Sequence, residues 1–241
     1  MFFDPLWFVF GIPAALFALW AQMRVKHAFT KYSQVTLRRP ISGADVAWAI
    51  VRSSGLEGVK VEPIHGHLTD HYDPRSRTLR LSEPVYESRS VAAVGVAAHE
   101  AGHSLQHAKG YAPLQLRSAW VPLASFGSNL SWLVLMAGVL LASIGGRGDR
   151  GQLGHMVIWA GIGLFAFVVA FTLITLPVEF DASRRAVALL SQKGIVTAEE
   201  EKGVREVLNA AALTYVAAAA SAILQLIYLI VRFGGAGRRD E

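Results

Sequence analysis

Apolar and polar positions alternate along this chain in long blocks, not with the short periods of soluble helices and strands. Four blocks are almost wholly apolar, and they cover residues 6–23, 120–144, 153–176 and 208–231. Each block is close to the length of about 20 residues that an α-helix needs to cross the hydrocarbon core of a bilayer. We therefore predict four transmembrane helices: an N-terminal anchor in residues 1–23, a hairpin in 120–177 and a last helix in 208–231.

The polar segment between the first two apolar blocks, residues 24–119, has the pattern of a small folded domain. Ser42 is a good N-cap for a helix that runs toward Gly55. Two short stretches with strand composition, 59–71 and 78–82, flank turn residues and predict a β-hairpin. This segment is therefore expected to combine helices with a small sheet.

A further helix is predicted from Val91, where small apolar residues lead without a break to His99. Its apolar part is too short to cross a bilayer, and Pro113 follows its last turns. Residues 178–207 are polar and predict another helix, and residues 232–241 form a tail. The predicted fold class is predominantly α, with about four transmembrane helices and a small α+β domain.

Composition supports a membrane protein and limits its chemistry. Hydrophobic residues make up 53% of the 241 residues and charged residues 17%, a balance typical of membrane proteins. The net charge of +5 comes largely from Lys and Arg beside the apolar blocks, where such residues set topology, so no nucleic-acid partner is expected. Cysteine is absent, so any zinc site must be built from His, Asp or Glu.

The flanks of the first apolar block predict the orientation of the chain. No Lys or Arg precedes the block, and five basic residues follow it: Arg24, Lys26, Lys31, Arg38 and Arg39. A cleaved secretory signal carries its positive charge on the other side, so we expect an uncleaved anchor. Because basic flanks stay in the cytoplasm, the polar domain is expected to face the cytoplasm.

Residues His99-Glu100-Ala101-Gly102-His103 match H-E-x-x-H, the zincin motif. Four residues turn an α-helix by about 400°, so both His side chains lie on one face, about 6 Å apart along the axis, and can bind one ion. Glu100 can take a proton from the attacking water without being a ligand. The α+β domain is therefore expected to be zincin-like and to lie at the membrane surface. The alternative for this pattern is a pair of surface histidines beside a glutamate.

A catalytic zinc ion takes three protein ligands, so the motif needs one more. His107 shares the helical stripe but lies about 12 Å along the axis from His99. Lys109 stands where a metzincin would have its third histidine. Glu179 is the better candidate, because the two crossings that end at Pro177 return the chain to the side of the motif. The alternative role of Glu179 is to stabilise a helix N-terminus.

Three further histidines lie in the predicted hairpin: His65, His67 and His71. Their alternate spacing puts them on one face if the strand is regular. We interpret them as part of an exposed polar face. A ligand role for one of them, and a second, regulatory metal site, stay open.

Beyond the motif, the chain resembles the YugP-like bacterial membrane zinc metallopeptidases, also called neutral zinc metallopeptidases. The resemblance covers nearly the whole chain and rests on five blocks: residues 72–75, 79–82, 96–107, 176–186 and 211–218. It implies a peptidase with one zinc ion per chain, integral to the inner membrane of a bacterial cell, and it leaves the substrate open. More distantly, the chain is similar to the HtpX-like and CAAX prenyl protease gluzincins.

The gluzincin resemblance implies a role for residues after the third apolar block. In those families the third ligand is the first residue of an E-x-x-x-D motif, which Glu179 matches. Ser183 stands at the last position of that motif, and an aspartate appears earlier, as Asp181. Asp181 either orients a ligand histidine or caps a helix. Arg184 is a second residue that could contact the metal ligands without binding the metal. The residue that stabilises the oxyanion stays open among Tyr72, Arg184 and Arg185.

These observations lead to one main hypothesis and two alternatives. The main hypothesis is a membrane-bound peptidase that uses zinc to hydrolyse a polypeptide substrate, in a role such as membrane protein processing or quality control. The alternatives are a non-enzymatic membrane protein with a structural zinc ion and a zinc hydrolase that acts on a non-peptide amide. An intramembrane protease of the site-2 type is disfavoured, because the motif does not lie inside an apolar block.

Overall fold

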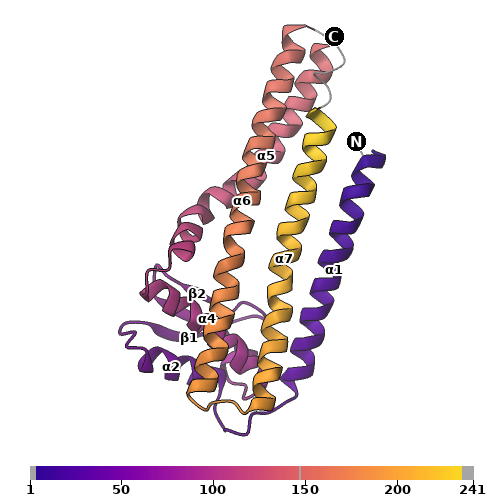
Figure 1. Ribbon diagram of the computed structural model, residues 1–241. Coiled ribbons are helices and arrows are strands. Elements are labelled where there is room, and N and C mark those ends of the chain that lie inside the picture. Colours follow the sequence, from indigo (N-terminus) through magenta and orange to yellow (C-terminus); the bar gives the residue numbers. More distant parts are fainter. Residues whose placement is uncertain (1–3, 147, 235–241) are drawn as a thin grey trace. The chain divides into compact units, whose positions relative to one another are not determined.

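The computed structural model describes residues 4–146 and 148–234, in which the chain forms seven helices and three strands (Figure 1). The helices are α1 (Pro5–Ser33), α2 (Gly43–Ser53), α3 (Glu83–Tyr86), α4 (Val91–Ala108), α5 (Ala112–Gly145), α6 (Asp149–Gln192) and α7 (Ala198–Gly234). The strands are β1 (Lys60–Ile64), β2 (His71–Asp73) and β3 (Thr78–Ser82). The chain is mostly helical with one small sheet, as predicted. Most of the predicted tail, from residue 235 onward, lies outside the described residues.

Four of these helices are long and apolar enough to cross a membrane: α1, α5, α6 and α7. They contain the four apolar blocks of the sequence, and each extends beyond its block. The prediction of four candidate transmembrane helices is therefore confirmed in length and composition.

The chain divides into two compact units, and the first is made of segments of the four candidate transmembrane helices. This unit takes residues 1–19, 116–175 and 215–241. Its core joins α5, α6 and α7 through side chains such as Leu135, Ile158 and Leu229, each less than 4% exposed. Glycine allows α5 and α6 to approach closely, since a Cβ atom on Gly154 would lie 2.3 Å from the backbone nitrogen of Ala142. Small residues at such contacts are typical of helix pairs in membranes.

The second unit, residues 20–115 and 176–214, is built around α4. The core packs α4 against α2, the sheet, α6 and α7. Val94, Ala97 and Ala98 of α4 are fully buried. A helix surrounded in this way needs small apolar side chains on nearly every face, which explains its Ala- and Val-rich sequence. The zincin motif therefore lies in a packed interior.

Local signals fix the ends of the helices in this second unit. The side chain of Ser42 accepts a hydrogen bond from the Asp45 backbone, and the Asp45 carboxylate accepts one from the Ser42 backbone, which together form a capping box at the start of α2. Ser90 caps α4 by accepting from the Ala93 backbone N–H. Beyond the other end of α4, Gly110 takes a positive φ of 62°, as glycine does after many helices. The predicted starts of both helices are confirmed.

The sheet has the strand order β1-β3-β2, with β1 parallel and β2 antiparallel to β3. A hairpin is present at the predicted turn, but its first strand is β2 and not the predicted segment 59–71, whose strand β1 pairs with β3 in parallel. However, the prediction of a single strand over residues 59–71 is wrong. Gly66 and Leu68 take φ values of 116° and 58°, which a strand does not allow, so a loop separates β1 from β2. His65 and His67 lie in this loop and do not share a strand face with His71.

The prediction of one polar helix over residues 178–207 is also wrong. α6 continues through Pro177, although proline removes one helical hydrogen bond, because backbone groups beside an apolar block find few partners outside the helix. The break comes later, at Gly194, which has a φ of 57°. There the Ile195 backbone N–H donates to the Leu190 carbonyl over 2.9 Å, in the pattern of a Schellman motif, and α7 begins three residues further on.

Candidate metal centre

α4 presents the two histidines of the motif on one face of the helix. The ring centroids of His99 and His103 lie 4.8 Å apart, with an interplanar angle of 85°. Their side chains are only 13% and 9% exposed. The spacing of four residues thus brings two imidazoles together in a largely dry environment, as the helix period predicts.

α6 brings Glu179 to the same place from 80 positions further along the chain. The close approach of the two helices depends on Gly102 inside the motif. A Cβ atom on Gly102 would lie 2.7 Å from the Ala182 carbonyl oxygen, so a larger residue would push α6 away. Glu179 itself is 2% exposed. The small residue in the motif therefore has a packing reason: it admits the helix that carries the carboxylate.

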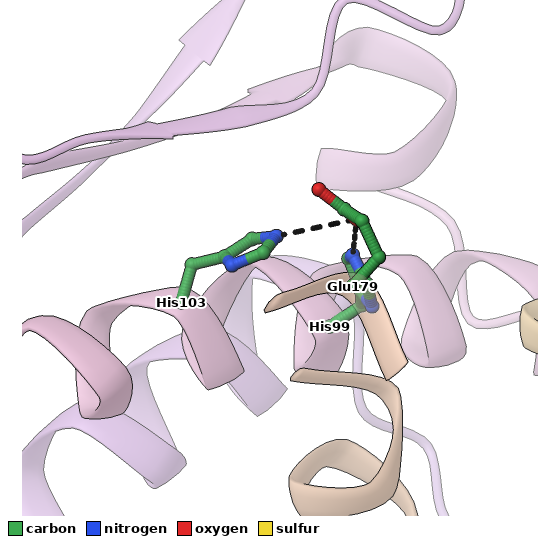
Figure 2. A group of neighbouring side chains, drawn as sticks. All are labelled: His99, His103 and Glu179. Carbon is green, nitrogen blue, oxygen red and sulfur yellow. Dashed lines mark hydrogen bonds and ion pairs between the residues drawn. The ribbon is translucent and has the colours of Figure 1, made fainter. Parts of the chain in front are cut away.

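The three side chains have the spacing that a zinc ion requires. Figure 2 shows the Glu179 carboxylate facing both rings, with its Oε2 3.2 Å from Nε2 of His99 and 3.6 Å from Nε2 of His103. Two ligands of a tetrahedral zinc ion, each about 2.0–2.1 Å from the metal, lie about 3.3 Å apart. One ligand atom from each residue falls within a group no wider than 4.8 Å. The donor set of two imidazoles and one carboxylate therefore fits zinc.

The charges of the candidate metal centre are coupled. Burial by itself would raise the pKa of Glu179, but hydrogen bonds and charges from His103 and His99 lower it strongly. Burial by itself would lower the pKa of His103, but the hydrogen bond to Glu179 and the charges of Glu100 and Glu179 raise it. Glu179 is therefore ionised at neutral pH and can bind a cation, while protons compete with a metal ion for His103 as the pH falls.

Glu100 lies beside the three ligand groups without joining them. It is 9% exposed, and its carboxylate is absent from the group of ligand atoms in the described residues. Its charge nevertheless helps to raise the pKa of His103. A carboxylate that is near a metal site and free of coordination can act on a water molecule there.

Each histidine uses its second ring nitrogen for a contact that holds the ring in place. Nδ1 of His99 lies 3.1 Å from Oγ of Ser183, and Nδ1 of His103 lies 3.0 Å from Oε1 of Gln106. Both Nε2 atoms are thereby left facing Glu179. Such outer contacts fix the tautomer and the orientation of metal-binding histidines.

Comparison with known proteins agrees with this geometry. Residues 7–234 match the family described as "Putative neutral zinc metallopeptidase". The chain belongs to this family. It is also 45% identical over 235 residues to "Putative membrane protease YugP" of Bacillus subtilis (strain 168), which covers 97% of this chain and 99% of that protein. No solved structure matches the chain.

Asp181 makes no direct hydrogen bond to His99 or His103. Its Oδ2 accepts a hydrogen bond from Nε2 of Gln106 over 2.9 Å, and its carboxylate is paired with Arg184 and Arg185. Burial by itself would raise the pKa of Asp181, but its hydrogen bonds with Arg185, Gln106 and Arg184 lower it. The Arg184 side chain is 77% exposed and is paired with Asp181.

The other histidines of the sequence lie outside the three-residue group. His107 is engaged with Tyr72, whose hydroxyl lies 2.9 Å from its Nδ1, and both side chains line a cavity of about 380 Å³. Nδ1 of His65 lies 2.7 Å from Oε1 of Glu83 on the surface. No second cluster of three metal-binding side chains is present in the described residues.

Two residues of the centre were not singled out as functional from the sequence. The sequence marks Ser183 only as a departure from the gluzincin motif, at the position four residues after Glu179. Gln106 was missed entirely. The signal available for it was its spacing of three residues from His103, which puts both side chains on one helix face.

Proposed function

We propose that this protein is a membrane-bound zinc metallopeptidase of the gluzincin type that holds one zinc ion per chain. The observation that carries the proposal is the spacing of ligand atoms from His99, His103 and Glu179. Two histidines and a glutamate form a known catalytic set, which leaves the fourth position for water or substrate. A structural zinc site usually fills all four positions with protein ligands, whereas the described residues supply three.

In this proposal Glu100 moves the proton that the reaction requires. Zinc bound at the site supplies a Lewis acid that activates water and polarises the scissile carbonyl. Glu100 accepts a proton from the attacking water while the water oxygen bonds to the carbonyl carbon. As the C–N bond breaks, Glu100 returns that proton to the leaving nitrogen. One peptide bond and one water molecule thus give one carboxyl and one amino terminus.

Tyr72 is the best supported of the three oxyanion candidates. Arg184 and Arg185 are both ion-paired with Asp181. The Tyr72 hydroxyl lies beside Nδ1 of His107, one turn after His103 on α4. When Nδ1–H of His107 donates to the Tyr72 oxygen, the hydroxyl hydrogen stays available for a substrate oxygen.

The proposed substrate is a polypeptide, because the matched family is described as a peptidase and the relative as a membrane protease. The proposed location is the inner membrane of a bacterium, with lipid around the four apolar helices. The basic residues after the first apolar block favour a cytoplasmic site. Processing or quality control of membrane proteins fits an enzyme in this location.

Replacement of Glu100 by Gln tests the proposal. On protein purified in detergent, the variant should keep one zinc ion per chain but lose hydrolysis of an unfolded protein substrate, because the carboxylate acts on water and does not hold the ion. Glu87→Gln, at an exposed position of the same unit, is the matched control. Tyr72→Phe should keep zinc and lower kcat about 100-fold.

Three outcomes would contradict the proposal. Full activity of Glu100→Gln would remove the proposed base. A wild-type protein that binds zinc but hydrolyses neither polypeptides nor other amides would support a structural zinc ion. Hydrolysis of non-peptide amides alone would support a zinc hydrolase with a different substrate.

A further inference from the structure

Gln106 occupies an unusual position for an amide side chain, because it is fully buried and uses both ends of the amide. It lies on α4, three residues after His103, and is 0% exposed. Its Oε1 lies 3.0 Å from Nδ1 of His103. Its Nε2 donates over 2.8 Å to the Val178 carbonyl oxygen and over 2.9 Å to Oδ2 of Asp181. The amide thus bridges a candidate metal ligand on α4 and two acceptors on α6.

These partners allow only one orientation of the amide. The Val178 carbonyl oxygen accepts hydrogen bonds but cannot donate one, and the same holds for the Asp181 carboxylate, which is ion-paired with Arg184 and Arg185. If the amide were reversed, its oxygen would face two acceptors in a buried site, at the cost of two unsatisfied hydrogen bonds. The nitrogen must therefore face α6, and the oxygen must face α4.

The fixed oxygen in turn selects the tautomer of His103. An amide oxygen can only accept, so Nδ1 of His103 must carry the hydrogen. In a neutral imidazole the lone pair is then on Nε2, which is the nitrogen that faces Glu179. The Gln106 amide therefore holds the His103 ring in the tautomer whose Nε2 can bind a metal ion.

We infer that Gln106 is the positioning residue of the zinc ligand His103, and that Asp181 acts on the metal centre only through the Gln106 amide. The inference rests on the proposed zinc site but not on peptidase activity. It also separates the two histidines, because His99 is held by Ser183 and does not depend on this relay.

A double-mutant cycle on zinc affinity tests the relay. The variants are Gln106→Leu, Asp181→Ala and the double variant, with zinc Kd measured by chelator competition on the full-length protein in detergent. Gln106→Leu should weaken zinc binding about 10- to 100-fold, and Asp181→Ala should weaken it in the wild-type background. In the Gln106→Leu background Asp181→Ala should have no further effect, because its path to His103 is already broken. Gln106→Met, of the same side-chain length, replaces the leucine variant if that variant does not fold.

Two controls distinguish a positioning role from simple docking of the two helices. Tyr111→Phe removes another hydrogen bond to α6, at the Pro177 carbonyl, and should leave zinc affinity unchanged. Ser183→Ala should weaken zinc binding by the same factor with or without Gln106, because it acts through His99. In the cobalt-substituted protein, Gln106→Leu should also change the visible absorption spectrum, which reports the ligand field.

The inference is overturned if Gln106→Leu and Gln106→Met bind zinc as tightly as the wild type, or if the effects of Gln106→Leu and Asp181→Ala simply multiply. An unchanged cobalt spectrum would equally overturn it, by reducing Gln106 to a docking contact. Failure of the proposed peptidase activity would leave these measurements intact, because none of them uses hydrolysis.

Discussion

At the scale of single residues, Glu179 is the proposed third ligand that would complete the zinc site of the two motif histidines. Its Oε2 lies within 3.6 Å of both Nε2 atoms. We expect Glu179→Ala to lower zinc affinity at least about tenfold, whereas His107→Ala should stay loaded with zinc, because Nδ1 of His107 is engaged with Tyr72. Metal analysis of both variants side by side makes the comparison. A zinc-loaded Glu179→Ala protein beside a zinc-free His107→Ala protein would contradict the ligand set.

Residues of the centre differed in how far the sequence could predict them. His99 and His103 could be predicted, because the period of one helix places their side chains on the same face. Glu179 required an argument about the path of the chain, in which two membrane crossings return it to the same side. For Gln106 the sequence offered only its spacing from His103, because its partners on α6 lie 72 and 75 positions away and only the folded chain brings them together.

At the scale of elements, the contact between α4 and α6 holds the two parts of the centre together. Gly102→Ala would place a methyl group 2.7 Å from the Ala182 carbonyl oxygen. We expect this overpacking to destabilise the protein by about 1–3 kcal/mol and to weaken zinc binding by moving Glu179. Gly163→Ala is the matched control, since a Cβ atom there has no neighbour within 4 Å. Thermal unfolding and zinc titration of both variants provide the measurement, and equal behaviour would refute the packing argument.

The start of α7 carries a pH-dependent contact. Glu200 accepts hydrogen bonds from the backbone N–H groups of Thr197 and Arg38. Burial by itself would raise the pKa of Glu200, but these bonds lower it. A carboxyl group whose pKa is lower in the folded state stabilises the fold above the unfolded value of about 4.3, and this contribution is lost as the pH falls through the folded value.

Glu200→Gln should therefore lower the melting temperature at pH 7, and the difference from the wild type should shrink as the pH falls below about 4.3. Glu199→Gln, at the exposed neighbouring position, is the control and should leave the melting temperature nearly unchanged at both pH values. A difference for Glu200→Gln that grows toward low pH would reverse the predicted sign.

Elements with local signals were predictable, and elements set by distant contacts were not. The cap at Ser42 gave the start of α2, since capping depends on neighbouring residues only, and the run of small apolar residues from Val91 gave the start of α4. The parallel pairing of β1 with β3 was missed, because no local pattern encodes which strands pair. The continuation of α6 through Pro177 was not predicted. Proline usually ends a helix, but backbone groups beside an apolar block find few partners outside the helix.

At the scale of the whole molecule, we predict that the loop after α4 and the loop before α6 lie on opposite sides of the membrane. The chain lacks cysteine, so single cysteines give a clean labelling assay. In intact cells a membrane-impermeant thiol reagent should label Asp149→Cys and should label Lys109→Cys only after permeabilisation. Both positions are exposed. Labelling of Lys109→Cys from outside would overturn the proposed orientation.

The most direct test of the central claim is zinc X-ray absorption spectroscopy on the purified wild-type protein, combined with its metal content. We expect one zinc ion per chain with four nitrogen or oxygen ligands at about 2.0–2.1 Å, two of them imidazoles. In Glu179→Ala the zinc content should fall, and the imidazole signal should fall with it. A wild-type protein without stoichiometric zinc, or a zinc ion with three imidazole ligands that is unchanged in Glu179→Ala, would contradict the account.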